Sequence, residues 1–357
     1  MNTWGTKIRL SIFGESHGEA LGIVIDGLKA GTKLNLENIN KFIDRRRAGK
    51  SSFTTSRKEK DEYRILSGYK DGHTTGAPLC VIFENTNTQS KDYEDLKVLL
   101  RPNHADYPAA IKFKGFNDIR GGGHFSGRIT LALTFAGAVA TDILEEKGIK
   151  IFSHIKKILD IKDKSFLDFK EVDIDKFKNL KESSLAFIED DLEIKAKELL
   201  EKIKLSGNSV GGEIECACYN LPVGLGSPFF DSLESKISHL AFSVPAVKGI
   251  QFGIGFDFSN ILGSEANDLY YLEDDKIKTK TNNNGGILGG LSTGMPLVFS
   301  VVIKPTPSIS IEQETVNIKE MKNDILKISG RHDACIVPRV MPVIEAITAL
   351  AILDEIL

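Results

Sequence analysis

The stretch RITLALTFAGAVATDILEEKG (residues 128–148) is apolar over most of its length. A helix that is hydrophobic all round has no face to offer to solvent, so it is expected in the interior of a protein. Ser126 stands where a helix cap is expected, and Gly148 marks the C-terminal end. The sequence therefore predicts a buried helix over this stretch.

The rest of the chain predicts elements that could pack around this helix. A second apolar helix is predicted over RVMPVIEAITALAILDEIL (339–357), and an amphipathic helix over LNLENINKFIDRRRAGK (34–50), with its three arginines at the C-terminal end. Strand-like runs occupy the remainder: 6–13, 20–27, YRILSG (63–68), APLCVIFEN (77–85), 209–222, 247–256 and 295–305. Periodicity alone predicts strands and two buried helices but does not choose an architecture.

A different composition marks the middle of the chain, from about residue 156 to residue 207. Lys, Asp and Glu are abundant there, and EDDLEIKAKELLEKIKLSG (189–207) has one charged face and one stripe of Leu and Ile. This pattern is typical of a helix at the surface. We expect the segment to be peripheral, without a direct chemical role.

Composition excludes several classes of protein. The formal net charge is −3, which argues against a general nucleic-acid binder, because such binding needs a basic surplus. The four cysteines form no CxxC pair and are expected to be buried thiols in a reducing compartment. No signal-peptide layout occurs at the start, and no stretch approaches the ~20 apolar residues of a membrane span. We therefore expect a cytoplasmic protein that binds neither nucleic acid nor membrane.

The nine residues RGGGHFSGR (120–128) predict an anion-binding corner. Three consecutive glycines free the backbone to expose its N–H groups, and an arginine stands at each end. SGR occurs again at 329–331, shortly before the second apolar helix. Three residues can recur by chance, so an internal duplication is one explanation and coincidence is the other.

Histidines in loops are the candidates for proton transfer. His17 lies in GESHG, His104 in RPNHAD and His332 in GRHDAC, each among glycine, proline or charged residues. No two histidines stand one helical turn apart, so the spacing does not predict a metal site. GESHG matches the GxSxG pattern of serine hydrolases, but a strand follows it where those enzymes have a helix. Acid–base chemistry by His17 and His104 is the favoured interpretation.

Arginines gather in the same kind of loop, whereas lysines dominate the charged middle segment. Arginine forms bidentate bonds to carboxylate and phosphate, so this separation indicates a small polyanionic ligand. The turn NNNGGILGGLSTG (282–294) and the segment IKPTPS (303–308) could hold a second phosphate-bearing ligand. Neither a P-loop nor a Rossmann fingerprint is present. The arginines in question are Arg45, Arg46, Arg47, Arg57, Arg101, Arg120, Arg128, Arg331 and Arg339.

These motifs together resemble the chorismate synthase family. The resemblance extends from Phe13 to Arg339, and the motifs occur in the family's order: GESHG, RRRAGKSSFTTSRKEKDEYRILSG, RPNHADY, RGGGHFSGR, AVKGIQFG, GGILGGLSTG, IKPTPS and GRHDACIVPR. It implies an α+β fold in which central helices are covered by antiparallel sheets, a β-α-β sandwich with pseudo-twofold halves. It also implies one domain over residues 1–357 and a homotetramer.

The resemblance implies an activity as well. Members of the family convert 5-enolpyruvylshikimate 3-phosphate to chorismate and phosphate by an anti 1,4-elimination, the last common step of aromatic amino acid biosynthesis. The reaction requires reduced FMN without net redox change, so an external flavin reductant is expected as a partner. The flavin is needed because no side chain is a strong enough base to remove an unactivated ring hydrogen.

Individual roles follow from the matching motif positions. His17 resembles the residue that protonates the departing phosphate, His104 the residue that keeps the reduced flavin in its working protonation state, and Asp333 a carboxylate that relays a proton. Substrate contacts are implied for Arg46, Arg101, Arg128 and Arg331. FMN contacts are implied for His124, Phe125, Ser126, Ala246, Gly289, Lys304, Pro305, Thr306, Pro307, Ser308 and Arg331.

The sequence departs from the family pattern at three positions. Ala48 stands where proline is usual, Asn103 where glycine is usual, and Ser52 where an arginine usually contacts the substrate. We expect Lys50 to compensate for the missing charge at Ser52. Two other functions remain open: an NADPH-dependent flavin reductase on the same fold, and an RNA-binding or phosphate-ligand module resting on the basic run 45–58.

Overall fold

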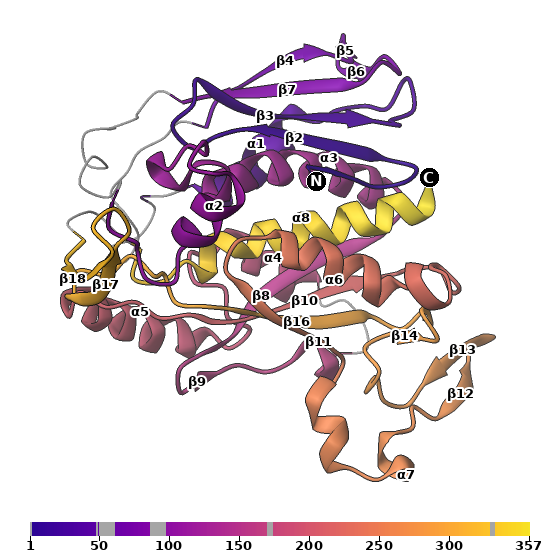
Figure 1. Cartoon of the computed structure of the whole chain (residues 1–357). Coiled ribbons are helices and arrows are strands. Elements are labelled where there is room, and N and C mark those ends of the chain that lie inside the picture. Colours follow the sequence, from indigo (N-terminus) through magenta and orange to yellow (C-terminus); the bar gives the residue numbers. More distant parts are fainter. Residues whose placement is uncertain (1, 48, 50–60, 86–97, 170–173, 329–332) are drawn as a thin grey trace.

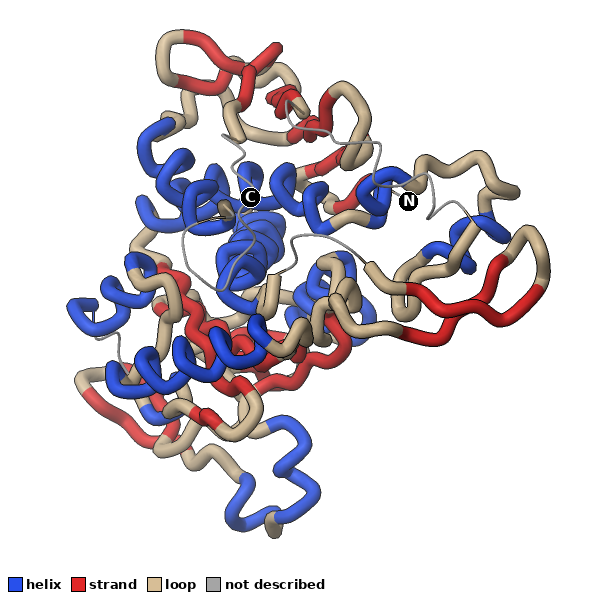
Figure 2. The backbone as a smooth tube through the Cα atoms, turned by 90° about the vertical axis from the view of Figure 1, so that its left-hand side faces the viewer, coloured by secondary structure: helices blue, strands red, loops and turns tan. Residues whose placement is uncertain are grey.

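The chain folds as two antiparallel sheets with helices packed between them (Figure 1). The computed structural model describes residues 2–47, 49, 61–85, 98–169, 174–328 and 333–357. The view turned by 90° also shows the helices gathered between the strands of the two sheets (Figure 2). This arrangement agrees with the predicted sandwich of central helices and covering sheets.

The first sheet comes from the N-terminal part of the chain. Its strand order is β1-β2-β3-β7-β4, and every neighbouring pair is antiparallel. Leu10 pairs with Ile25, and Ile23 pairs with Val81, so the apolar side chains of adjacent strands align on the helix-covered face. The strands span β1 Thr3–Trp4, β2 Arg9–Gly14, β3 Ala20–Asp26, β4 Tyr63–Ser67 and β7 Leu79–Glu84.

The second sheet is formed mainly by the later part of the chain, in the order β11-β16-β10-β8-β9, again with antiparallel neighbours. Strand β10 is buried along most of its length, as expected of a strand in the middle of a sheet. The strands span β8 Lys150–Ile158, β9 Ile161–Lys162, β10 Gly212–Tyr219, β11 Val247–Phe252 and β16 Leu297–Ile303. The predicted runs 209–222, 247–256 and 295–305 therefore share one sheet.

The remaining elements are helices and small hairpins. The helices span α1 Leu36–Arg46, α2 Asp106–Lys112, α3 Thr130–Glu146, α4 Ile174–Glu182, α5 Asp190–Leu205, α6 Leu233–Ser243, α7 Gly263–Ala266 and α8 Val337–Ile356. The short strands span β5 Tyr69–Lys70, β6 His73–Thr74, β12 Tyr270–Glu273, β13 Lys276–Thr279, β14 Ile287–Leu288, β15 Leu291–Ser292, β17 Gln313–Asn317 and β18 Lys322–Leu326. Both long apolar helices predicted from the sequence are present, as α3 and α8.

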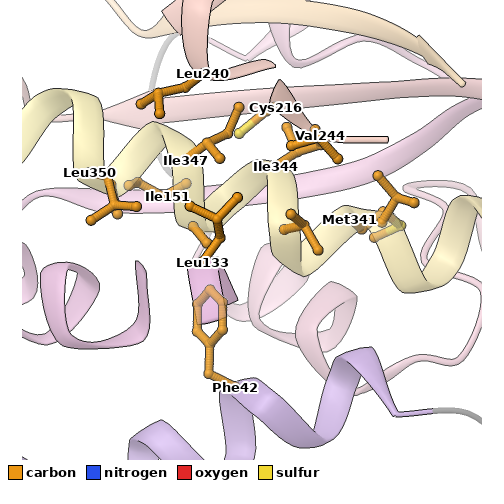
Figure 3. Packing of buried hydrophobic residues seen from close by; sticks show 14 of the residues in the cluster. Phe42, Leu133, Ile151, Cys216, Leu240, Val244, Met341, Ile344, Ile347 and Leu350 are labelled. Carbon is orange, nitrogen blue, oxygen red and sulfur yellow. The ribbon is translucent and has the colours of Figure 1, made fainter. Parts of the chain in front are cut away.

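Helices α3 and α8 cross at the centre of the sandwich without side chains to separate them. A Cβ atom built on Gly137 would lie 2.1 Å from Cβ and 2.3 Å from Cα of Ala346. Around this crossing Leu133, Ile344 and Ile347 interdigitate, and Phe42 of α1 points toward Leu133 (Figure 3). The glycine therefore allows the two backbones to approach closely.

One sequence-based expectation about these helices was wrong. We expected no stretch suited to a membrane span, but among the described residues the helical stretch Gly127–Glu146 is long and apolar enough to cross one. Of its most apolar window, 83% is buried inside the structure. The apolar composition fits this position between two sheets, where most residues of the helix are shielded from solvent.

The charged middle segment contributes to the interior as well as to the surface. Within α5, Ala196 and Leu200 are the buried residues, as expected of a surface helix. Phe166 and Phe177, however, are fully buried against strand β8 and its neighbours. The segment packs on the outer side of the second sheet through these rings.

A buried ionic cluster joins this segment to the second sheet. His154 on β8 bonds through Nδ1 to Asp163 Oδ2 at 2.9 Å and through Nε2 to Glu215 Oε2 at 3.1 Å. Burial opposes the charged imidazole, but the hydrogen bonds to Asp163 and Glu215 outweigh it and raise the pKa of His154. Burial likewise opposes the Glu215 carboxylate, but His154 and Lys156 lower the pKa of Glu215 to about 2. The cluster therefore holds charged partners together.

These shifts predict how stability depends on pH. The contribution of Glu215 is complete above its usual pKa of 4.5 and is lost as the pH falls toward about 2. The contribution of His154 is complete below its usual pKa of 6.5 and is lost as the pH rises through the raised value. We expect His154→Gln to lower the free energy of unfolding by about 3–5 kcal/mol near pH 6, because two carboxylates lose their buried partner.

Urea unfolding at a series of pH values would measure this effect. The difference between the wild-type chain and His154→Gln should shrink as the pH rises, whereas the exposed His73→Gln variant should match the wild-type chain throughout. A difference for His154→Gln that is constant with pH would show that the imidazole is not charged in the folded chain.

The α3–α8 crossing gives a second prediction. At an uncrowded helix position a change from Gly to Ala stabilises by about 1 kcal/mol, but an extra methyl group in a packed core destabilises by about 1–3 kcal/mol. We expect Gly137→Ala to destabilise the chain and Gly137→Val to do so further. Gly263→Ala in α7 is the control, since a Cβ there meets nothing within 4 Å. A urea midpoint that rises for Gly137→Ala would contradict the close crossing.

Candidate active site

His17 lies in the turn between β2 and β3, against the glycine-rich loop. The side chain is buried, and a Cβ on Gly121 would lie 2.7 Å from its Nε2 atom. The neighbouring Ser16 donates its backbone N–H to the carbonyl of Gly123 at 3.1 Å. The loop thus fixes one side of the imidazole, which only a residue without a side chain permits.

The glycine-rich loop does not continue the helix that follows it. Gly121, Gly122 and Gly123 have φ values of 59°, 86° and 54°, in the left-handed region that glycine adopts without strain. Ser126 then accepts a hydrogen bond from the backbone of Arg128 at 3.3 Å and caps the short turn that leads into α3. The predicted cap is confirmed, and the loop stands at the start of the central helix.

His124 ties this loop to the first sheet. Its Nδ1 atom bonds to the carbonyl oxygen of Gly14 at 2.7 Å and its Nε2 atom to Asn2 Oδ1 at 3.1 Å. Both ring nitrogens are therefore engaged by the protein. The next residue, Phe125, is 46% exposed and has its ring centroid 6.2 Å from that of Phe113, so an apolar face remains open beside the loop.

Asp61 links two of the arginines predicted to contact a substrate. Arg128 donates to Asp61 Oδ1 at 2.5 Å and to Asn85 Oδ1 at 3.0 Å, while Arg46 NH1 lies 3.7 Å from Asp61 Oδ2. Arg46 is 4% exposed and also donates to the carbonyl oxygen of Gly127 at 2.8 Å. Arg46 therefore holds the glycine-rich loop from the buried side, and the side chain of Arg128 is slightly more exposed to solvent.

Asp333 lies beside the start of α8. Arg339 donates to Asp333 Oδ2 at 2.7 Å and, through Nε, to the carbonyl oxygen of Arg46 at 3.1 Å. This guanidinium therefore connects the carboxylate to the end of α1. Arg331 and His332, and with them the second SGR sequence, lie outside the described residues.

His104 forms a second group with the segment after β16. Its Nε2 atom bonds to Ser308 Oγ at 3.1 Å and its Nδ1 atom to the carbonyl oxygen of Pro102 at 3.1 Å. Lys304 Nζ donates to the carbonyl oxygen of Asn103 at 2.7 Å. Two segments about 200 positions apart in the sequence are thus joined by two hydrogen bonds.

Burial and neighbouring cations keep His104 neutral. Burial is the larger cause and the Arg101 guanidinium the next, and together they lower the pKa of His104 from 6.5 to about 4. Arg101 itself is held by Asp106, to which it donates at 2.8 Å and 2.7 Å. At neutral pH the imidazole is therefore uncharged and can both donate and accept a hydrogen bond.

Of the other residues predicted to bind FMN, Ala246 lies next to this second group, Gly289 lies in the β14–β15 turn on another part of the molecule (Figure 1), and Arg331 lies outside the described residues. Lys304 donates its backbone N–H to the carbonyl oxygen of Ala246 at 2.9 Å, so the two predicted positions are adjacent. Ala246 has a φ of 76°, a conformation that costs a non-glycine residue roughly 1–2 kcal/mol. Gly289 also has a positive φ, of 61°, and a Cβ there would meet nothing within 4 Å.

Helix α2 connects the two groups. Its first residue, Asp106, holds Arg101 beside His104, and its C-cap, Phe113, contacts Phe125 of the glycine-rich loop. A helix of this length spans about 10 Å at a rise of 1.5 Å per residue. The structure therefore places the glycine-rich loop and the His104 group at opposite ends of one short helix.

Comparison with known proteins is consistent with this geometry. A family model described as chorismate synthase matches residues 8–357. Chorismate synthase of Thermococcus kodakarensis is 43% identical over 354 residues, which cover 99% of this chain and 97% of that protein. The corresponding protein of Methanococcoides burtonii is 45% identical over 359 residues, covering 100% of this chain and 96% of that protein.

The chain belongs to the chorismate synthase family. Chorismate synthases are lyases that act on a small molecule in aromatic amino acid biosynthesis, so the predicted family and enzyme class are confirmed. A crystal structure of a chorismate synthase superposes with a TM-score of 0.76 at 28% sequence identity, over 99% of this chain and 92% of that chain. The predicted α+β fold is confirmed as well.

The structure explains one departure from the usual sequence of chorismate synthases. Asn103, at a position where glycine is usual, has a φ of 60°. Asparagine is among the residues that tolerate this left-handed conformation, so the turn is kept and its carbonyl oxygen still accepts from Lys304. Ala48, Lys50 and Ser52 lie outside the described residues, and the proposed compensation by Lys50 stays a prediction.

Several residues of the candidate active site were missed by sequence reasoning. Asp61, Asn85 and Asp106 each hold an arginine of the site in place. The sequence around them carries little signal, because a single acidic or amide side chain at the end of a strand is common on any surface. Arg339 was noted as one of the loop arginines, but its bond to Asp333 was not expected.

The pKa of His104 gives a prediction that does not depend on catalysis. Replacing Arg101 by Gln removes a nearby positive charge and frees Asp106, so we expect the pKa of His104 to rise from about 4 toward 6.5. The rise should be partial, since burial is the larger cause. An NMR titration of the His104 ring protons would measure it, with the exposed Arg64→Gln variant as the control. An unchanged pKa in Arg101→Gln would rule out the electrostatic contribution.

Proposed function

We propose that the chain converts 5-enolpyruvylshikimate 3-phosphate to chorismate and phosphate with the help of reduced FMN. The observation that carries this proposal is the pair of hydrogen bonds joining the loop of His104 to the Lys304–Ser308 segment. They unite a predicted proton-transfer residue with the predicted flavin-binding segment. Membership in the chorismate synthase family supports the same assignment.

The residues around Lys304 suit an anionic, hydrogen-bonding cofactor. Thr306 Oγ1 is buried and has no hydrogen-bond partner among the described residues, so a bound group could supply one. Burial and the neighbouring Lys248 lower the pKa of Lys304, which a bound anion would reverse. We assign FMN binding to this segment together with Ala246, Gly289, Arg331 and the His124–Ser126 loop. When bound by these residues, reduced FMN would supply transient electron density and a place for the ring hydrogen to go.

His17 is the proposed acid for the departing phosphate. The reaction breaks the carbon–oxygen bond to phosphate and a carbon–hydrogen bond of the ring, and a new double bond forms between ring carbons. A proton on the phosphate oxygen makes it a better leaving group, at a scale of about 10²–10⁴-fold in rate. Close packing of Gly121 against the imidazole holds the ring in one orientation for this transfer.

His104 is the proposed residue that sets the protonation state of the flavin. Its imidazole is neutral at pH 7 and is oriented by Ser308 and by the carbonyl oxygen of Pro102. A neutral ring can hydrogen-bond to a cofactor without adding a competing charge. Asp333, held by Arg339, is the proposed proton relay.

The arginines are proposed to bind the three anionic groups of the substrate. Arg101 and Arg128 are held by Asp106 and Asp61, which restricts their rotamers before a ligand arrives. Arg46 is buried behind the glycine-rich loop, so a direct contact with substrate would require its bonds to Gly127 and Thr130 to open. We retain Arg331 as a substrate and flavin contact by the family resemblance.

Assembly, location and reductant belong to the same proposal. We propose a cytoplasmic homotetramer, supported by large apolar side chains that the single chain leaves exposed, such as Phe230 at 91% and Phe256 at 81%. Phe256 precedes α7 and the β12–β13 hairpin, which project from the body of the chain (Figure 1).

The flavin is proposed to be reduced by an external partner, so the purified chain should not oxidise NADPH in the presence of FMN.

An anaerobic assay tests the proposed activity. Purified protein, dithionite-reduced FMN and 5-enolpyruvylshikimate 3-phosphate should produce chorismate, detected by its absorbance, and oxidised FMN should not support the reaction. His17→Ala should lower kcat by about 10²–10⁴-fold. Exposed His73→Ala is the matched control and should keep the wild-type rate. Absence of turnover by a folded wild-type chain with bound reduced FMN would refute the proposal.

A further inference from the structure

A large cleft borders the candidate active site at Arg339. Its volume is 960 Å³, and it runs between α1, α3, α4 and the start of α8, with β8 at its base. None of His17, His104 and Asp333 lines it. A cleft of this size is large enough for an organic ligand. Nothing in the proposed reaction uses it.

The middle of the cleft is apolar and carries two aromatic rings. Phe42 on α1 and Phe152 on β8 line it together with Met341 on α8. Arg45 lies 5.5 Å from the centre of the Phe42 ring, and Lys181 lies 5.1 Å from that of Phe152. Figure 3 shows that Phe42 and Met341 come from different helices, α1 and α8. Both cations are already paired with carboxylates, Arg45 with Glu345 and Lys181 with Glu145, so this part of the cleft suits the apolar body of a ligand.

The two ends of the cleft carry buried polar atoms that lack partners. Nε of Arg47 and Oδ2 of Asp142 make no hydrogen bond within the described part of the chain. Both residues line the cleft, so a bound molecule could satisfy both atoms. The first is a donor and the second is an acceptor.

The spacing of these atoms sets the length of the ligand. Asn38 donates to the other oxygen of Asp142 at 3.1 Å, so it marks the Asp142 end on helix α1. Arg47 follows Asn38 by nine residues, which correspond to about 13 Å along a helix. A ligand that meets both residues should therefore be no longer than about 13 Å.

We propose that the cleft binds an elongated organic anion with an apolar ring in its middle. The anionic group lies at the Arg47 and Arg339 end, where it competes with Asp44 for the guanidinium of Arg47, and a hydrogen-bond donor on the ligand's other end meets Asp142. The ligand needs a donor at this end because an ionised carboxylate, such as that of Asp142, can only accept hydrogen bonds. Burial, followed by the charges of Glu145 and Glu146, raises the pKa of Asp142, and a bound donor would relieve this.

Arg339 couples the cleft to the candidate active site. It lines the cleft, and it also bonds to Asp333 at 2.7 Å and to the carbonyl oxygen of Arg46 at 3.1 Å. An anion that draws Arg339 into the cleft weakens both bonds, so binding should inhibit turnover. This inhibitory effect rests on the proposed function, whereas binding does not.

Calorimetric titration with 4-(4-aminophenyl)butyrate tests the binding. This probe carries a carboxylate, a ring and an amino donor; 4-phenylbutyrate lacks the donor. Arg47→Ala should weaken binding of both probes at least 10-fold. Asp142→Leu should weaken binding of the amino probe by a similar factor and leave 4-phenylbutyrate unchanged. Lys195→Ala, on the exposed face of α5, should bind both as the wild-type chain does.

Urea unfolding first compares each variant with the wild-type chain, so that a loss of fold is recognised. If Arg47→Ala does not fold, Asp142→Leu is the decisive variant. Equal affinity for the amino probe in wild type, Arg47→Ala and Asp142→Leu would overturn the site. Binding of the probe without any loss of chorismate formation would overturn the coupling alone. A chain that binds the probe but forms no chorismate under any condition would instead refute the proposed function.

Discussion

Gly137 and Ala346 bring the backbones of α3 and α8 into direct contact at the centre of the fold. At this point α3 and α8 approach so closely that even a methyl group on Gly137 would overlap the backbone of the other helix. The two helices fix the distance between the sheets that cover them (Figure 1). They also fix the positions of the segments at their N-terminal ends, where the glycine-rich loop and Asp333 lie.

Three segments of the site lie at the ends of these central helices. The glycine-rich loop precedes α3, and Asp333 precedes α8. Arg46 is the last residue of α1. Arg46 bonds to the loop before α3, and Arg339 bonds to both Arg46 and Asp333. A shift of one central helix would therefore disturb all three at once, which explains how a buried crossing controls polar chemistry at the surface.

Local patterns allowed much of the fold to be predicted from the sequence. The apolar length of α3, its cap at Ser126 and the left-handed glycines before it depend on neighbouring residues, so periodicity and turn chemistry reveal them. The pairing of Arg128 with Asp61, or of His104 with Ser308, depends on residues 67 and 204 positions apart. No local pattern encodes such contacts. We did not expect α3 to be long and apolar enough for a membrane span. A helix in a protein core and a helix in a bilayer can have the same apolar composition, so composition alone does not separate them.

In the proposed function, the glycine-rich loop and the Lys304–Ser308 segment bind one flavin and one substrate side by side. The most direct test is a crystal structure of the chain with FMN and 5-enolpyruvylshikimate 3-phosphate bound. We expect density for the isoalloxazine ring in contact with Lys304–Ser308, and density for the substrate between that ring and His17. Flavin density remote from either segment, or substrate density in a cavity that His17 does not reach, would contradict the account.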